Sequence, residues 1–460
     1  MDYLLTLTKN ANEFLGYVLL FALCGTGLYF TIRLGFVQIR KFGESFKLTF
    51  GGIKFGAKAG KDGMSSFQSL ATAIAAQVGT GNLAGAAAAI ATGGPGAIFW
   101  MWVSAFFGMA TIYAEATAAQ KFKSKTENGD VVGGPAYYIM AGIKGNLGKI
   151  LAKIFAVCII LALGFFGIMV QSNSISDSFK TAFGFNPIIV GVVIAIIILI
   201  IVLGGVKRIA SITEKLVPAM ALIYIIGSLI IIFANITHIP EAFRQIIVGA
   251  FNPTAAIGGA VGVTVKAAIT YGVKRGLFSN EAGMGSTPHA HALAKVNHPC
   301  EQGVVSMMGV FIDTFIILNL TALVILTTNS LQYVDGVATL TSIALTQAAF
   351  TSLFGSFGNI FIAICLFFFA LSTIIGWYFF GEINIKFLFG DKGTKFYAII
   401  VAIFIVLGGA LKVDLVWELS DFFNLLMVLP NLVGLIAVSG VVLALTKEYE
   451  KDPTRLKQQK

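Results

Sequence analysis

Long apolar runs separated by short polar stretches dominate the pattern of this sequence. We interpret eleven runs as membrane-spanning helices, because a helix needs about 20 mostly apolar residues to cross a bilayer. Their expected bounds are 13–32, 67–90, 97–120, 150–179, 187–204, 214–233, 257–292, 303–326, 353–380, 396–411 and 415–445. The pattern therefore predicts an all-α polytopic membrane protein, with one extra N-terminal helix followed by ten core helices, numbered here from one to ten.

Two of these spans, core helices one and six, contain clusters of glycine and polar residues. Core helix one holds QVGTGN at 77–82, and core helix six holds Gly272, Gly276 and the run FSNEAGMG at 278–285. Glycine disfavours helix, although it also allows close helix packing in membranes. Irregular backbone at bilayer depth is tolerated only inside protein or along a cavity. The two clusters therefore predict interrupted helices beside a central site.

The two interruptions occupy equivalent places in two sets of five helices. Each lies in the first helix of its set, and an odd number of helices makes the second set enter the membrane inverted. Paired interrupted helices in inverted halves indicate the binding site of a secondary transporter. The predicted organisation is an N-terminal helix and basic loop (1–65), a first repeat (66–240), a second repeat (241–446) and a tail (447–460).

Charge decides the orientation and excludes other classes of protein. Only 12% of the residues are charged and 57% are hydrophobic, whereas a soluble domain has about 25% charged residues.

The net charge is +10, and most Lys and Arg lie in alternate loops and the tail, whereas the opposite side carries Lys9, Lys180, Arg244 and Lys412. Because Lys and Arg stay cytoplasmic, we expect the N-terminus outside and the C-terminus inside. The basic residues thus mark a membrane face and indicate no nucleic-acid partner.

The stretch GGPGAIFWMWVSAFFG at 93–108 resembles the signature of the alanine/glycine:cation symporter (sodium:alanine symporter) family. The GTGN break at 79–82 and the run at 278–285 are similar to the same family, and the match covers essentially the whole chain. The resemblance implies the LeuT-type fold with a five-plus-five inverted repeat. It also implies a plasma-membrane symporter that imports alanine or glycine with sodium by alternating access.

Two alternatives to this function stay open. A proton-coupled carrier of small amino acids would have the same fold. A membrane-embedded enzyme or channel is the more distant alternative, because the sequence lacks a convergent acid–base or metal constellation and a channel needs no paired interrupted helices. We therefore expect no enzymatic activity.

A zwitterionic amino acid needs donors for its carboxylate and acceptors for its ammonium group. The outer half of core helix one should begin near Gly81-Asn82, so that free N–H groups meet the carboxylate, with Thr80 as a further donor. The inner half should end near Gln77, where unpaired carbonyl groups suit the ammonium group, and Gly276 should offer a carbonyl in the same way. Glycines at the break let the ligand approach the backbone.

Three further residues of the core helices complete the predicted pocket. Gln171 could contact the carboxylate or bond to a neighbouring helix, because it is polar within an apolar run. Phe278 and Trp377 could limit the cavity to small side chains, although large aromatics often serve packing. The predicted substrate-binding residues are Gln77, Gly79, Thr80, Gly81, Asn82, Gln171, Gly276, Phe278 and Trp377.

The resemblance to LeuT-type transporters places a sodium ion between core helices one and eight. Carried over by the GTGN match, its ligands are the carbonyl groups of Ala75, Val78 and Phe369 and the hydroxyl groups of Ser372 and Thr373. Hydroxyls in membrane helices also often bond to their own helix. A second ion beside the substrate would use Asn82 and Thr270.

Ionisable residues at bilayer depth are functional candidates. We expect Glu115 to accept hydrogen bonds from exposed N–H groups of the interrupted helix six, a structural role. Asp313 could pair with Lys274 or Arg275, or assist coupling. Metal binding by His289, His291, His298 and Cys300 is not expected, because their spacing fits no strong zinc pattern.

The expected ligands and partners are therefore few. The four cysteines show no paired spacing and three lie in apolar segments, which indicates packing. We expect no cofactor, with sodium as the coupling ion. The expected partners are a small neutral amino acid, sodium and the lipid bilayer, with no nucleic acid and no requirement for an oligomer.

We predict that a cysteine placed at Gln458 in the tail stays unlabelled by an impermeant maleimide in intact cells, whereas one placed at Lys9 is labelled. The distribution of Lys and Arg is the reason. Permeabilised cells, in which both positions should react, are the control. Labelling of the tail from outside intact cells would refute the orientation.

Overall fold

The computed structural model consists mainly of helices, and it describes residues 2–51, 56, 58–60, 62–253, 263–411 and 413–451. The chain begins with α1 (Asp2–Arg33). The first set of core helices comprises α4 (Ser66–Gln77), η1 (Gly81–Gly85), α5 (Ala86–Gly93), α6 (Gly96–Lys121), α8 (Asn146–Ile159), η2 (Ile160–Gly167), α9 (Ile168–Phe183), α10 (Pro187–Val202) and α11 (Gly205–Ala234). The second comprises α14 (Val265–Asn280), α15 (Pro288–Ala292), α16 (Pro299–Val310), η4 (Phe311–Leu318), α17 (Asn319–Thr327), α19 (Ser356–Phe389), α20 (Thr394–Ala410) and α21 (Val413–Ala437).

Short elements connect these helices on both sides of the molecule. They are α2 (Val37–Arg40), α3 (Phe42–Gly51), α7 (Pro135–Gly142), η3 (Ile236–His238), α12 (Ile239–Phe251), α18 (Ser342–Phe354), η5 (Asp391–Gly393) and α22 (Ser439–Lys451). Two small antiparallel hairpins pair β1 (Ser124–Lys125) with β2 (Val131–Val132) and β3 (Tyr333–Val334) with β4 (Val337–Ala338). The sequence analysis did not anticipate α12 and α18, because each has only 13 residues, fewer than a membrane span.

Local sequence signals explain where several helices begin. Ser65 forms a capping box with Gln68 at the start of α4, which satisfies two N–H groups that a helix leaves free. The Thr264 side chain accepts from the N–H of Ala267 at the start of α14, and α10 begins with an Asn186 cap followed by Pro187. The helices that carry the two interruptions therefore start at fixed positions.

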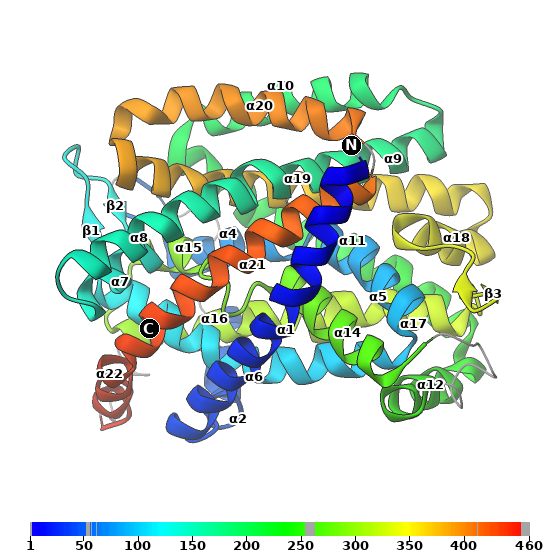
Figure 1. Cartoon of the computed structure of the whole chain (residues 1–460), viewed down its shortest axis with the longest axis horizontal. Helices are drawn as coiled ribbons and strands as arrows, with labels where there is room; N and C mark the ends of the chain where they lie inside the picture. The colour runs from blue at the N-terminus through cyan, green and yellow to red at the C-terminus, as the bar shows by residue number, and fades with distance from the viewer. Residues whose placement is uncertain are drawn as a thin grey trace.

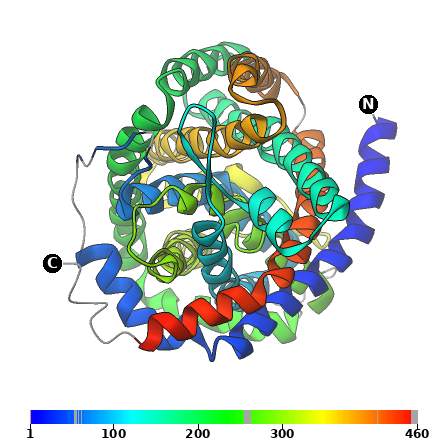
Figure 2. The ribbon, with the colours of Figure 1, turned by 90° about the vertical axis from the view of Figure 1, so that its left-hand side faces the viewer.

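The arrangement is a bundle of long helices with smaller helices at its ends (Figure 1). Helix α6 packs against α14 and α16, α19 packs against α9, and α10 packs against α20. The N-terminal helix α1 runs along the outside of the bundle and packs on α21 (Figure 2). Large exposed apolar side chains are frequent on α1, α10, α11 and α20, which suits a surface that faces lipid.

Eight helices of the described residues are long and apolar enough to cross a membrane. A ninth span is the pair Ser66–Gln77 and Gly81–Gly93, which bends by 46° at its break. The predicted core helix four corresponds to α10, which has 16 residues. Part of the span predicted at 257–292 lies outside the described residues, so the count of eleven spans stays a prediction.

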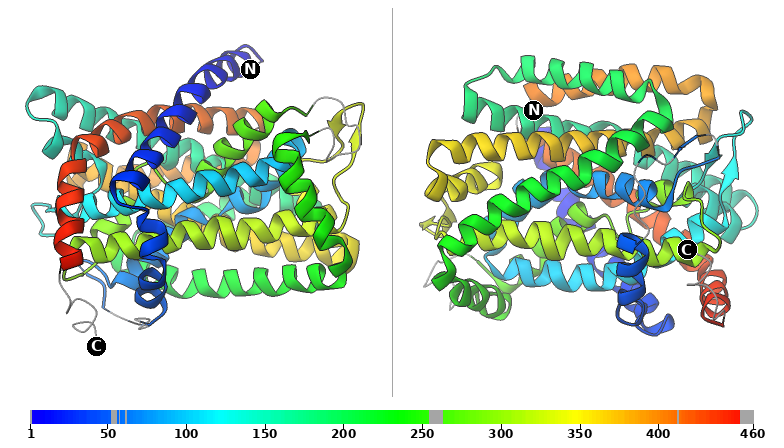
Figure 3. Two further views of the ribbon diagram at one scale, coloured as in Figure 1. Left: turned by 90° about the horizontal axis from the view of Figure 1, so that it is seen from below. Right: turned by 180° about the vertical axis from the view of Figure 1, so that it is seen from behind.

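The span predicted at 415–445 is too long, because its last eight residues lie beyond the end of α21. Helix α21 ends at Ala437 and α22 begins at Ser439, and the two helices run in different directions (Figure 3). Polar contacts explain the turn, because Tyr449 donates to the Glu44 carboxylate and Glu450 pairs with Arg40. Helix α22 therefore docks on the segment after α1.

Candidate functional site

The break in core helix one exposes backbone groups that neighbouring side chains bind. Helix α4 ends at Gln77, and the chain resumes as helix at Gly81. The N–H of Gly79 donates to Asn82 Oδ1 (2.9 Å), and the N–H of Thr80 donates to Gln171 Oε1 (3.2 Å). Two side-chain carboxamides thus occupy N–H donors just before Gly81-Asn82, where the sequence predicts the substrate carboxylate.

The break in core helix six begins later than the sequence predicts. Helix α14 continues to Asn280, and Glu281 takes the left-handed conformation with φ 58°. The prediction of a free carbonyl at Gly276 is therefore wrong, because Gly276 lies within a continuous helix. A Cβ atom at Gly276 would lie 2.9 Å from Ser104 Oγ, so this glycine allows α14 to pack closely on α6.

The Glu115 carboxylate binds the backbone of this second break. It is fully buried on α6 and accepts from the N–H groups of Gly283 and Gly285, both at 3.0 Å. These are hydrogen bonds of the kind that the sequence analysis expected for Glu115. Asn431 of α21 donates to Glu115 Oε1 (2.6 Å) and to the Gly283 carbonyl (2.9 Å). Sequence reasoning missed Asn431, because nothing in its neighbourhood marks it as a partner.

The predicted pairing of Asp313 with Lys274 or Arg275 is wrong. Both cations pair with Asp421 of α21, Lys274 Nζ at 2.7 Å and Arg275 Nη1 at 3.2 Å. Lys274 and Arg275 lie on the part of α14 that faces α21. Ser279, which contacts Asp313, lies one turn further along, at the end of α14 that meets η4. The sequence holds no local signal for a partner that is about 146 residues away.

Asp313 instead joins the two interrupted helices. Its carboxylate accepts from Asn82 Nδ2 (2.6 Å), Ser279 Oγ (2.9 Å) and Thr314 Oγ1 (2.9 Å). Asn280 Nδ2 donates to Thr314 Oγ1 (3.1 Å). The buried carboxyl group therefore connects η1, the end of α14 and η4 through hydrogen bonds.

The predicted sodium ligands form one cluster of oxygen atoms. Thr373 Oγ1 lies 3.0 Å from the Ala75 carbonyl oxygen, 3.4 Å from that of Val78 and 3.1 Å from that of Phe369. Ser372 Oγ lies 3.2 Å from the Ala75 oxygen and 2.8 Å from the Phe369 oxygen. The structure thus brings together three carbonyl and two hydroxyl oxygens between the end of α4 and the middle of α19.

Gly79 has a steric role at this cluster. A Cβ atom there would lie 2.3 Å from Thr373 Oγ1 and 3.1 Å from Gln171 Oε1. Any larger residue would push α19 away from the break. Gly81 is equally crowded, since its Cβ would lie 2.9 Å from the Cα of Ser279. The two glycines therefore hold the interruption close to α19 and α14.

Two polar atoms of the first break have no hydrogen-bond partner among the described residues. They are Thr80 Oγ1 and Gln77 Oε1, and both side chains are buried. The other end of the Gln77 side chain, Nε2, donates to the Asn280 carbonyl (2.6 Å). Since a buried polar atom without a partner is unfavourable, these atoms are candidates to bind a ligand.

Aromatic rings border the same region. The Phe278 ring lies edge-on to Trp377 at 5.7 Å and also contacts Trp417 at 5.0 Å. Trp377 Nε1 donates to the Glu281 carboxylate, whose other oxygen accepts from Ser286. The predicted aromatics are therefore neighbours, while Trp417 and the role of Glu281 were missed. Glu281 lies inside the polar run at 278–285, which was the available signal.

The remaining candidates are not brought together. Thr270 lies on the wall of a cavity beside α1, whereas Asn82 bonds to Asp313. His289 bonds to Ser286 and Asn384, and His291 bonds to Gln302. Within the described part of the chain, no group of three or more His, Cys, Asp or Glu side chains is arranged to hold a metal ion.

Known proteins resemble this chain over nearly its whole length. Residues 1–460 match the profile of the sodium:alanine symporter family. The sodium/alanine symporter AgcS of Methanococcus maripaludis is 44% identical over 98% of both chains, and the probable sodium/glutamine symporter GlnT of Bacillus subtilis is 42% identical over 96% of this chain and 90% of its own. The structure of MhsT in complex with L-phenylalanine has a TM-score of 0.56 at 15% identity, over 88% of this chain and 92% of that one. This last likeness shows the LeuT-type fold alone.

We predict that Glu115→Ala lowers the thermal stability of the purified protein in detergent. The change leaves the buried N–H groups of Gly283 and Gly285 without an acceptor, at a cost of about 1–3 kcal/mol for each donor. Intrinsic tryptophan fluorescence during heating gives the melting temperature. Glu115→Gln keeps one acceptor oxygen, so its melting temperature should lie between those of the wild type and Glu115→Ala. The exposed Glu448→Ala is the control. An unchanged melting temperature in Glu115→Ala would contradict the assignment.

Proposed function

Because the chain belongs to the sodium:alanine symporter family, we propose that it imports alanine or glycine with sodium across the plasma membrane by alternating access. The observation that carries this proposal is the five-oxygen cluster between the end of α4 and α19. A cluster of neutral oxygens at a helix end can replace the water shell of a monovalent cation. Such a site needs no carboxylate.

Local physics favours a cation at this cluster. The carbonyl groups at the end of α4 have no partner within their own helix, and a helix C-terminus carries partial negative charge. Ser372 and Thr373 donate their hydroxyl hydrogens to these carbonyls. When sodium binds, the hydroxyls would rotate and present their oxygens instead. The ion would then hold the interrupted helix one against helix eight, which links ion binding to the position of the break.

The same break supplies the groups for the amino acid. The carboxylate would bind where η1 begins, displacing the Gln171 carboxamide from the Thr80 N–H and using the unpartnered Thr80 hydroxyl. The ammonium group would bind Gln77 Oε1 and the carbonyl groups at the end of α14. Substrate and sodium would thus share one interruption, so that each strengthens the binding of the other.

The aromatic rings would control how large a side chain the substrate can have. Phe278 and Trp377 contact each other beside the two breaks, and a larger substrate side chain would have to displace them. One relative is named as a probable sodium/glutamine symporter, so the size of the substrate is a property that a test must decide for this chain. We therefore propose that these rings restrict this protein to small substrates.

We predict that Thr373→Ala weakens sodium activation of alanine uptake in proteoliposomes by about 5- to 150-fold. The change removes one ligand oxygen, and an unmatched buried polar partner costs on the order of 1–3 kcal/mol. Thr373→Ser keeps the oxygen and is the matched control. Unchanged sodium dependence in Thr373→Ala would place the ion elsewhere, and uptake that never depends on sodium would favour the proton-coupled alternative.

We predict that leucine fails to compete with labelled alanine in the wild type but competes in Phe278→Ala. Phe278 makes ring contacts with Trp377 and Trp417, so its truncation enlarges the pocket without orphaning a polar group. Competition is measured in the uptake assay, with alanine uptake itself as the check that the variant is intact. Leucine that competes equally well in both proteins would remove the size argument.

A further inference from the structure

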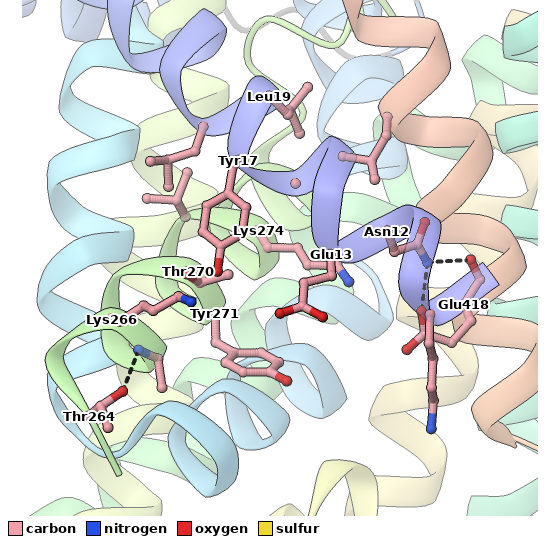
Figure 4. Close-up of a pocket in the computed structure, with 16 residues that line it drawn as sticks. Asn12, Glu13, Tyr17, Leu19, Thr264, Lys266, Thr270, Tyr271, Lys274 and Glu418 are labelled. Carbon is pink, nitrogen blue, oxygen red and sulfur yellow. Dashed lines mark hydrogen bonds between the residues drawn. The ribbon is translucent and has the colours of Figure 1, made fainter. Parts of the chain in front are cut away.

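A cavity of about 530 Å³ lies between the first half of α1, the start of α14 and the start of α21 (Figure 4). It is separate from the breaks described above and faces the side that we predict to be outside. Helix α1 contributes Lys9, Asn12, Glu13 and Tyr17 to its wall, although this helix lies outside the ten core helices. The cavity is therefore partly built by an addition to the core.

We propose that this cavity is a second, outer binding site for a zwitterionic amino acid, where the substrate waits before it reaches the interrupted helices. The proposal rests on the proposed function. The charged residues on the wall are Lys9, Glu13, Lys266, Lys274 and Glu418. Positive and negative side chains thus line one cavity. They are complementary to a molecule that carries both an ammonium and a carboxylate group.

Contacts between α1 and the core hold these charges in place. Lys266 Nζ lies 5.0 Å from the centre of the Tyr17 ring, a cation–π distance. The Asn12 side chain donates to both the carbonyl (2.9 Å) and the carboxylate (2.6 Å) of Glu418. Figure 4 shows the Glu13 side chain pointing toward Tyr271, away from its own helix. Residues of α1 therefore position Glu418 and Lys266, and α1 itself carries Glu13.

Asn12 also offers an unused acceptor. The residue is 5% exposed, and its Oδ1 atom has no hydrogen-bond partner among the described residues. Because Glu418 accepts from the other end of the same carboxamide, Asn12 Oδ1 and the Glu418 carboxylate are close together. An ammonium group bound there would satisfy the buried oxygen and gain a charged partner.

The floor of the cavity is positive. Lys274 lines both this cavity and a small one of about 20 Å³ that reaches Phe278. Lys274 and Arg275 share the single carboxylate of Asp421, and the Arg275 guanidinium lies 4.4 Å from the centre of the Trp417 ring. Two cations against one carboxylate leave a net positive charge beside the cavity, and the substrate carboxylate would face it.

The mixture of charges selects the occupant. Glu13 and Glu418 would repel the phosphate of an anionic lipid, and the three lysines would repel a free sodium ion. A small neutral amino acid satisfies both sets of charges at once.

The test separates capture of substrate from its binding at the breaks. We expect Glu13→Gln and Lys266→Gln to raise the KM for alanine uptake about 3- to 10-fold in proteoliposomes at about 10 mM ionic strength, where charges act over about 30 Å. The equilibrium Kd for labelled alanine at saturating sodium and the maximal rate should stay unchanged. Glu241→Gln on α12, an exposed glutamate away from the cavity, is the matched control and should leave the KM unchanged.

Each other outcome overturns the outer site. An unchanged KM in both variants means that the cavity does not handle substrate. A Kd that rises together with the KM means that these residues act on the inner site alone, and an effect that depends on anionic lipid in the liposomes means that the cavity holds a headgroup. Wild-type protein that takes up no alanine would refute the proposed function and the outer site together, whereas normal wild-type uptake with an unchanged KM refutes the outer site alone.

Discussion

Backbone N–H and carbonyl groups that leave a helix at bilayer depth have no water to bind, and they must find partners inside the protein. The two breaks of this structure meet this need with side chains from other helices. Asn82 and Gln171 accept from the first break, and Glu115 accepts from the second. Helices α6 and α9 are therefore tied to the breaks by polar contacts as well as by apolar packing.

The same constraint gives the site its chemistry. In the proposed function, a bound ion or substrate would replace some of the amide and hydroxyl groups that now satisfy the first break. Thr373, for example, donates to the carbonyl groups that would bind sodium, and Gln171 accepts from an N–H that would bind a carboxylate. In the proposed mechanism both residues hold the break before the ligand arrives; Thr373 would then turn its oxygen to the ion, and Gln171 would give way to the carboxylate.

The sequence predicted the parts of this arrangement that local pattern determines. Glycine within a polar cluster located the first break, and a lone glutamate in an apolar run identified Glu115. The start of the second break was misplaced, because a glycine such as Gly276 can continue a helix when it packs against a neighbour, whereas Glu281 ends the helix by its left-handed backbone. The partners Asp421 and Asn431 were missed, since only the folded chain brings α21 against α14 and α6.

The central claim is that sodium and a small amino acid bind at the break of one interrupted helix and cross together. Uptake of radiolabelled alanine by proteoliposomes, with and without an inward sodium gradient at equal ionic strength, tests it most directly. The account predicts accumulation above the outside concentration with the gradient, and a return to equilibrium when a sodium ionophore is added. Equal uptake in the presence and absence of the gradient would contradict it.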